Sequence, residues 1–402
     1  MLASLALIIL VGLVMAAICQ KLKLPRIIGL LFTGILLGPN VLQLLDASIL
    51  SVSADLRKIA LIIILMKAGL SLDVNDLKKV GRPAIMMSCV PAIFEIMGFL
   101  VFAPRLLHIS TTEAAVMGAV LAAVSPAVVV PRMVQLMETH YGTGKSIPQL
   151  ILAGASCDDI FVVVLFSTFV NMARGDGMQA TALLHIPISI VLGIALGAAA
   201  GLLLALFFET AYAKKHHVRN SMKVLIILGT AFLLVSMETW LEGKLAVSGL
   251  LAVVSMACVL KVKCTKPVTK RLSEKFGKLW LAAEVLLFVL VGAAVDIAYT
   301  MEAGIMAVAM ILIALVFRAA GVSLCMVKTQ LTAKERLFCV IAYLPKATVQ
   351  AAIGSVPLAL GLPCGNIVLS VAVLGILITA PLGAIGIDMS YKKLLTRDGE
   401  KE

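Results

Sequence analysis

Two adjacent acidic residues, Asp158 and Asp159, lie near the middle of an apolar stretch that covers residues 147–173. A helix of about 20 apolar residues crosses about 30 Å of hydrocarbon, so both carboxylates are expected deep inside a membrane. Because burial favours the protonated acid and a bound cation favours the carboxylate, the doublet predicts a site where a cation and protons compete. The plainer interpretation is a helix break or a polar contact to a neighbouring helix.

The composition indicates an all-α polytopic membrane protein. Of the 402 residues, 61% are hydrophobic and 14% are charged, and the mean hydropathy is +1.09. The net charge of +12 comes from basic residues in short loops, which argues against nucleic acid as a partner. The eight cysteines form no CxxC pair, and the sequence contains no nucleotide motif, so we expect no cofactor and no enzyme.

The apolar segments predict thirteen membrane spans. Their expected bounds are 2–20, 27–45, 56–70, 83–104, 111–137, 147–173, 183–212, 221–240, 245–260, 278–295, 303–326, 335–361 and 366–388. Of the 34 Lys and Arg residues, 26 lie in or next to the odd-numbered connections and 5 in or next to the even-numbered ones. Basic residues gather on the cytoplasmic side, so the N-terminus is expected outside and the C-terminus in the cytoplasm.

The spans divide into two halves of six with the span 183–212 as a linker, which inverts the second half relative to the first. Paired interrupted helices are typical of such inverted-repeat transporters. The fifth span of each half contains prolines, Pro126 and Pro131 in the first half and Pro345 in the second. Because proline removes a backbone donor and its ring clashes with the preceding turn, we predict two discontinuous helices that cross at mid-membrane.

Four further charged residues lie in the predicted membrane interior. Glu95 is on the fourth span of the first half and Arg318 on the fourth of the second, so the pseudosymmetry predicts an ion pair between them. We expect Lys346 and Glu284 to offset the partial charges at the ends of the broken helices.

Oxygen ligands for a small cation are concentrated near the same prolines. Ser125, Thr348 and the backbone carbonyls freed by the breaks are expected to supply neutral oxygens. Na⁺ and Li⁺ are hard cations that prefer oxygen, so the carboxylates of Asp158 and Asp159 are the predicted metal ligands. Adjacent side chains on a helix project about 100° apart, so one of the two should face the ion more directly. Spacing alone does not say which.

Three segments resemble motifs of the monovalent cation/proton antiporter superfamily, and specifically of its NHA clade of Na⁺/H⁺ exchangers. They are SPAVVVPRM (125–133), GASCDDI (154–160) and LPKATVQAAIGS (344–355). The resemblance implies that Asp159 is the primary carrier of cation and proton, with Asp158 as its partner. It also implies a homodimer in a bacterial inner membrane, built from protomers whose core domain moves as an elevator.

The resemblance further implies a division of the chain into domains. Residues 1–70 and 221–295 are expected to form the two halves of a dimerisation domain, and residues 83–173 and 303–390 the two halves of an ion-transporting core. Residues 183–212 are expected to form the linker helix.

The stoichiometry is left open by one departure from the family pattern. Family members with two aspartates usually exchange two protons for one Na⁺, and many of them pair the first aspartate with a lysine. Arg318 stands at what looks like that position. An arginine is effectively never deprotonated, so it is a poor second proton carrier, and an electroneutral cycle remains open.

The predicted function is exchange of Na⁺ or Li⁺ for protons by alternating access, with both species competing for Asp159 and Asp158. A K⁺/H⁺ antiporter is the nearest alternative, because oxygen ligands alone do not exclude K⁺. A Na⁺-coupled organic-solute symporter could share the inverted-repeat architecture. An intramembrane aspartyl protease is disfavoured, because adjacent acids on one helix cannot flank a water and a scissile carbonyl.

Overall fold

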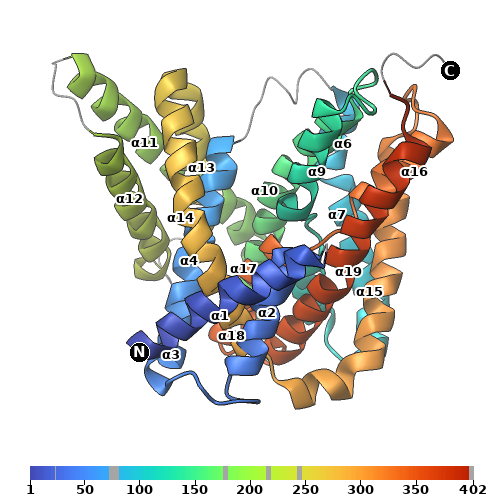
Figure 1. Ribbon diagram of the computed structural model, residues 1–402. Helices are drawn as coiled ribbons and strands as arrows, with labels where there is room; N and C mark the ends of the chain where they lie inside the picture. The colour runs from blue at the N-terminus through green and yellow to red at the C-terminus, as the bar shows by residue number, and fades with distance from the viewer. Residues whose placement is uncertain (23, 72–80, 175–179, 214–218, 242–246, 398–402) are drawn as a thin grey trace. The chain divides into compact units, whose positions relative to one another are not determined.

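The computed structural model describes residues 1–22, 24–71, 81–174, 180–213, 219–241 and 247–397 as a set of helices (Figure 1). These helices are α1 (Leu2–Lys21), α2 (Arg26–Leu37), α3 (Ala47–Ser51), α4 (Ser53–Ser71), α6 (Arg82–Met87), α7 (Val90–Leu106), α8 (Thr111–Leu121), α9 (Pro126–Glu138), α10 (Ile147–Ala173), α11 (Ala180–Ala213), α12 (Asn220–Trp240), α13 (Gly249–Lys263), α14 (Lys266–Ala293), α15 (Ile297–Cys325), α16 (Ala333–Ala342), α17 (Thr348–Gly354), α18 (Val356–Ala359) and α19 (Gly365–Leu394). The described residues form no strand, and their one β-bridge joins Tyr141 to Arg397.

Each predicted span coincides with a helix or with consecutive pieces of one. Among the described residues, 9 helices are long and apolar enough to cross a membrane, and two shorter apolar helices cover Arg26–Leu37 and Thr348–Ala359. The segments α6 and α7, α8 and α9, and α16 to α18 each take the place of one predicted span. The prediction of an all-α polytopic membrane protein is therefore confirmed.

The chain divides into two compact units. The first contains residues 1–54, 73–162 and 287–402, and the second contains residues 55–72 and 163–286. The first unit contains both interrupted helices. It also contains the part of α10 up to residue 162, which carries Asp158 and Asp159. It also includes residues 1–54, which the family resemblance places in a dimerisation domain, and that domain assignment stays a prediction.

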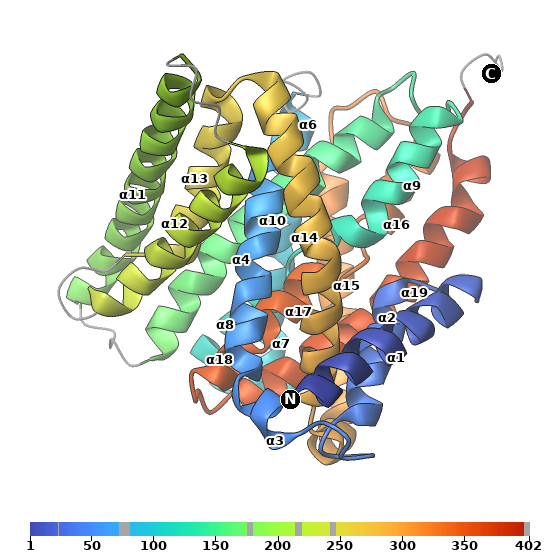
Figure 2. The same cartoon turned by 60° about the vertical axis from the view of Figure 1, so that its left-hand side comes forward.

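In the first unit, α7 packs along α15 (Figures 1 and 2). The two helices approach closely because each contributes a glycine at the contact. A Cβ on Gly98 would lie 3.0 Å from the Phe317 ring, and one on Gly321 would lie 2.9 Å from the backbone of Pro91. Small residues at such contacts let helix backbones approach, which is how helices associate in lipid. The contact brings Glu95 on α7 and Arg318 on α15 to the same level of the unit.

In the second unit, α11 packs along α13 (Figure 1). Gly193 and Gly201 of α11 lie against the backbone of α13, where added Cβ atoms would be 2.7 Å from the Ser248 carbonyl and 2.9 Å from the Met256 carbonyl. The Gly-rich and Ala-rich composition of the predicted linker helix therefore corresponds to close helix packing.

Two helices are interrupted, and their breaks meet. Residues 122–125 separate α8 from α9, and residues 343–347 separate α16 from α17. The backbone N–H of Ser125 donates a hydrogen bond of 2.7 Å to the carbonyl of Pro345, which joins one break to the other. Pro126 begins α9 and Pro345 lies inside the second break, so both occur where a missing donor is tolerated.

The prediction that Pro131 breaks its helix is wrong. Pro131 lies inside α9, which continues past it to Glu138. Its missing N–H affects the carbonyl four residues earlier, in the first turn of α9, and its ring meets only that turn. The helix has already been interrupted upstream of this turn, so the chain absorbs the change there without a second break.

Candidate functional site

Arg318 is fully buried at the centre of a charged cluster in the first unit. Its Nη1 lies 2.8 Å from Oε2 of Glu95, and its Nη2 lies 3.1 Å from Oδ2 of Asp158. The guanidinium also donates to the carbonyls of Tyr343 and Ala122. The pairing of Glu95 with Arg318 argued from the pseudosymmetry is thus present in the geometry, together with a second pair that involves Asp158.

Glu95 accepts a second cation. The Nζ of Lys346 lies 2.6 Å from Oε1 and 2.8 Å from Oε2 of Glu95, and it donates to the carbonyl of Leu121. The Lys346 backbone N–H donates to the hydroxyl of Thr379 on α19 at 3.0 Å, and this hydroxyl in turn donates to the carbonyl of Gly375. Lys346 therefore stands at the C-terminal end of α8, where a cation stabilises the partial negative charge of the helix.

The unwound stretch between α8 and α9 has its polar backbone groups satisfied by side chains. The carbonyls of Leu121, Ala122 and Ala123 accept from Lys346, Arg318 and Gln350, respectively. The last of these hydrogen bonds, from Gln350 Nε2, is 2.7 Å long. The N–H of Val124 donates to Oδ2 of Asp158 at 2.8 Å. These carbonyls were predicted to be ion ligands, but each of the three already accepts a hydrogen bond from a side chain. A buried carbonyl needs such a partner.

The two aspartates have different surroundings. Asp158 is completely buried and is held by Arg318 and by the Val124 N–H. Asp159 is 6% exposed, and no hydrogen bond or ion pair joins its carboxylate to another residue in the described part of the chain. The turn of about 100° between successive residues gives the two carboxylates different neighbours, and it is Asp158 that accepts from the Val124 N–H in the α8–α9 break.

The charges of this cluster leave Asp159 without a counter-charge. Glu95 and Asp158 contribute two negative charges, and Arg318 and Lys346 contribute two positive ones. The ionised carboxylate of Asp159 adds one further negative charge. One monovalent cation or one proton bound at Asp159 makes the buried group neutral, and an uncompensated buried charge is strongly unfavourable.

Several buried oxygens at this place have no hydrogen-bond partner among the described residues. They are Oδ1 of Asp158, Oδ1 of Asp159, Oγ of Ser125 and Oε1 of Gln350. Thr348, which begins α17, is also buried. Carboxylate, hydroxyl and amide oxygens are the types of ligand that a hard cation prefers.

Glu284 lies outside this cluster, in the second unit. It is buried on α14 and lies within electrostatic range of Lys67, which is 5.8 Å from the centre of the Trp280 ring. The expectation that Glu284 offsets an end of a broken helix stays a prediction.

Three residues at the cluster were not predicted from the sequence. Gln350 donates to Ala123 in the first break, and Thr379 accepts from the backbone N–H of Lys346 in the second. The hydroxyl of Tyr343 donates to the carbonyl of Met87 at 3.1 Å. Gln350 lies two residues after Thr348 inside a segment already identified as interrupted, so its position was available as a signal. Thr379 gives no comparable signal, because a threonine in an apolar helix usually bonds its own preceding turn.

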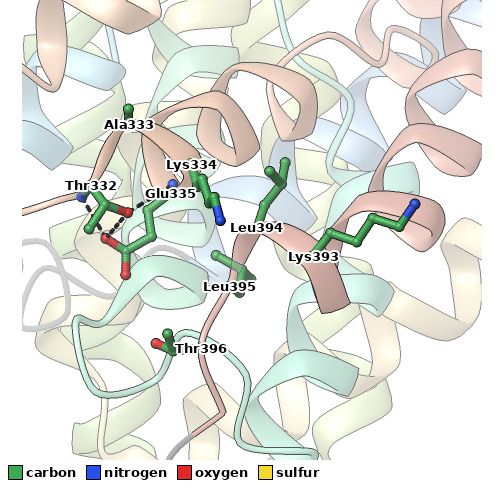
Figure 3. A pocket seen from close by; sticks show the side chains of 8 residues that line it. All are labelled: Thr332, Ala333, Lys334, Glu335, Lys393, Leu394, Leu395 and Thr396. Atoms are coloured by element: carbon green, nitrogen blue, oxygen red, sulfur yellow. Dashed lines mark hydrogen bonds between the residues drawn. The ribbon is translucent and has the colours of Figure 1, made fainter. Parts of the chain in front are cut away.

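The described residues also line a pocket of about 440 Å³ near the start of α16 and the end of α19 (Figure 3). Figure 3 shows Lys334 and Lys393 among the side chains that line it. Glu335 accepts there from the backbone and hydroxyl of Thr332, and its Oε2 lies 2.9 Å from Nζ of Lys145. The pocket includes none of the predicted site residues.

The sequence is similar to those of a known protein family. The profile of the family described as sodium/hydrogen exchanger, transmembrane, matches residues 5–392. Sodium/hydrogen exchanger 9B2 of Homo sapiens is 34% identical over 388 residues, which cover 93% of this chain and 70% of that protein. Sodium/hydrogen exchanger 9B2 of Xenopus tropicalis is 33% identical over 358 residues, which cover 86% of this chain and 64% of that protein. This chain thus spans between 64% and 70% of the length of these two relatives.

A solved structure shows the same fold. The sodium proton antiporter MjNhaP1 from Methanocaldococcus jannaschii, determined at pH 8, superimposes with a TM-score of 0.81 at 21% identity, over 97% of each chain. The family profile extends over nearly all of the chain, from the first helix to the last. The chain is therefore an integral membrane protein that belongs to the transmembrane sodium/hydrogen exchanger family.

Proposed function

We propose that this protein exchanges Na⁺ or Li⁺ for protons across a membrane. The observation that carries the proposal is the isolated carboxylate of Asp159, which is buried beside a charge-balanced cluster and has no partner among the described residues. Such a group is stable in the membrane interior only when a proton or a cation neutralises it. The two species therefore compete for one site.

The cycle follows from this competition. With the site open to one side, the cation binds ionised Asp159, assisted by the free oxygens of Asp158 and Ser125 and by the hydroxyl of Thr348. With the site open to the other side, a proton displaces the cation. The empty ionised site is the state that is costly to move, so exchange is coupled without a complex that holds both species.

The charge count favours one proton for each cation. Arg318 remains charged throughout, and Lys346 is held by Glu95 and by the Leu121 carbonyl, so neither is needed as a second proton carrier. We therefore propose an electroneutral cycle in place of the two-proton stoichiometry that the aspartate doublet implies by family resemblance.

The larger-scale features of the proposal rest on the family and on the loop charges. The breaks at 122–125 and 343–347 belong to one compact unit, which supports an elevator movement of the core segments that carry them. A homodimer, a bacterial inner membrane and a cytoplasmic C-terminus complete the proposal. The 26 to 5 distribution of Lys and Arg between alternate connections supports the orientation.

The test is proton movement in proteoliposomes that contain a pH-sensitive dye. Gradients of Na⁺, Li⁺ or K⁺ are imposed on the parent protein and on the Asp159→Asn variant. We expect Na⁺- or Li⁺-dependent proton flux in the parent, none in the variant, and no effect of a clamped membrane potential if the cycle is electroneutral. Flux that persists in Asp159→Asn would remove the carrier assignment.

The alternatives are separated by the same experiment. Flux driven by K⁺ in preference to Na⁺ would identify a K⁺/H⁺ antiporter. A correctly inserted parent that gives no flux with any of the three cations would favour a Na⁺-coupled organic-solute symporter, which moves a solute along with the ion.

A further inference from the structure

Gln350 is a fully buried amide on α17 that reaches across to the break between α8 and α9. Its Nε2 donates to the carbonyl of Ala123 at 2.7 Å and to that of Leu121 at 3.4 Å. Reversing the amide would set its oxygen against two carbonyl oxygens, so these contacts fix which end of the side chain is the donor.

The other end of this amide has no partner. Oε1 of Gln350 is buried and accepts no hydrogen bond from the described residues. Packing alone does not require an amide here, because a methionine would fill a similar volume; it would remove the unpaired Oε1 but would also take the donor from the Ala123 carbonyl. The polar side chain therefore has a use that depends on its hydrogen bonds.

Gln350 is the neutral member of the three donors that hold the α8–α9 break. Arg318 and Lys346 are each fixed to Glu95 by an ion pair, and they satisfy the carbonyls of residues 122 and 121. Gln350 makes the shorter of its bonds to Ala123. This carbonyl belongs to the residue directly before Val124, whose N–H donates to Asp158.

Those two residues connect the break to the ion site. The N–H of Val124 donates to Oδ2 of Asp158, and the neighbouring Ser125 carries one of the unpartnered buried oxygens. A peptide unit is planar, so the direction of the Ala123 carbonyl fixes the direction of the Val124 N–H on the same unit. The hydrogen bond from Gln350 thereby sets the orientation of a group that binds Asp158.

We propose that Gln350 is a positioning residue for cation binding. It orients the peptide between Ala123 and Val124, and through that peptide it holds Asp158 and Ser125 where they assist the cation at Asp159. This inference rests on the proposed cation/proton exchange and adds a residue outside the aspartate doublet on which cation affinity depends.

The test compares Gln350→Met with the parent in the proteoliposome assay. Met preserves the volume and removes both hydrogen bonds. We expect the KM for Na⁺ to rise about tenfold, the size that corresponds to one buried hydrogen bond, while Vmax per folded protein changes little. The ratio of the KM values for Na⁺ and Li⁺ should also change, because the smaller ion tolerates less displacement of its ligands.

A second readout does not depend on transport. A cation that binds only the folded protein raises the temperature of unfolding, so NaCl, compared with choline chloride, should stabilise the parent more than Gln350→Met. The matched control is Gln149→Met, which makes the same exchange in the first turn of α10, nine residues before Asp158. This control should retain the parent KM and the parent response to Na⁺.

The outcomes separate this inference from the proposed function. A parent that exchanges ions, together with a Gln350→Met variant of unchanged KM and unchanged stabilisation by Na⁺, overturns the positioning role alone. A parent without flux overturns both. If Gln350→Met does not fold, Gln350→Asn takes its place, because its shorter amide cannot span both carbonyls; an unchanged KM in that variant also overturns the role.

Discussion

At the scale of single residues, Glu95 holds the charged cluster together, because it is the common partner of Arg318 and Lys346. All three side chains are almost completely buried. A buried ion pair does not by itself guarantee stability, since desolvation offsets much of the attraction. Removal of one partner strongly destabilises the folded protein, because it leaves a buried charge uncompensated.

We therefore expect Glu95→Gln to destabilise the folded protein by about 3 to 5 kcal/mol. The measurement is thermal unfolding in detergent, followed by helix content. The double variant Glu95→Gln with Lys346→Met removes one charge of each sign and should recover part of the loss. The control is Glu138→Gln, which changes an exposed acid at the end of α9. A Glu95→Gln protein as stable as the parent would contradict the central role of this carboxylate.

At the scale of helices, the position of the second break depends on how closely α19 approaches it. Gly383 on α19 lies directly against the ring of Pro345, so that an added Cβ would overlap this ring. The Pro345 carbonyl accepts from Ser125, and the next residue is Lys346. The glycine therefore gives the unwound segment the space it occupies.

We predict that Gly383→Ala costs about 1 to 3 kcal/mol, the usual size for overpacking in a well-packed interior. It should also lower transport, because Pro345 can move only by shifting the segment that carries Lys346. Unfolding temperature and initial proton flux are the two measurements. Gly229→Ala on α12 is the matched control, since nothing lies within 4 Å of a Cβ there and alanine favours a helix. Equal stability of the two variants would show that Pro345 can move to make room for the added methyl group without destabilising the folded protein.

At the scale of the whole molecule, the alternation of basic residues predicts the orientation in the membrane. The 26 Lys and Arg residues at odd-numbered connections, against 5 at even-numbered ones, predict that both the fifth connection and the C-terminus face the cytoplasm. An epitope placed after Glu402 should be protected from protease in intact right-side-out vesicles, and one placed before Met1 should be cleaved. Permeabilised vesicles serve as the control. The reverse pattern of cleavage would mean that the N-terminus faces the cytoplasm and the C-terminus lies outside.

Much of this arrangement follows from the amino-acid sequence, because a membrane imposes few and strong rules. Thirteen segments, two of them broken by proline, and a pair of acids at mid-span result from span length, the missing donor of proline and the cost of burying charge. The position of Glu95 relative to Arg318 also follows, since it depends on the repeat and needs no side-chain detail. Pro131 shows where the local rule fails, because proline near a helix start is tolerated.

Only the tertiary structure decided how the buried polar groups are shared. Spacing left Asp158 and Asp159 equivalent, and the packing of α7, α8, α10 and α15 assigns one to Arg318 and Val124 and leaves the other without a partner. The roles of Gln350 and Thr379 are likewise fixed by contacts between segments more than 30 residues apart. The physical reason is that each buried donor and acceptor needs a partner, and which partner is within about 3 Å depends on the fold.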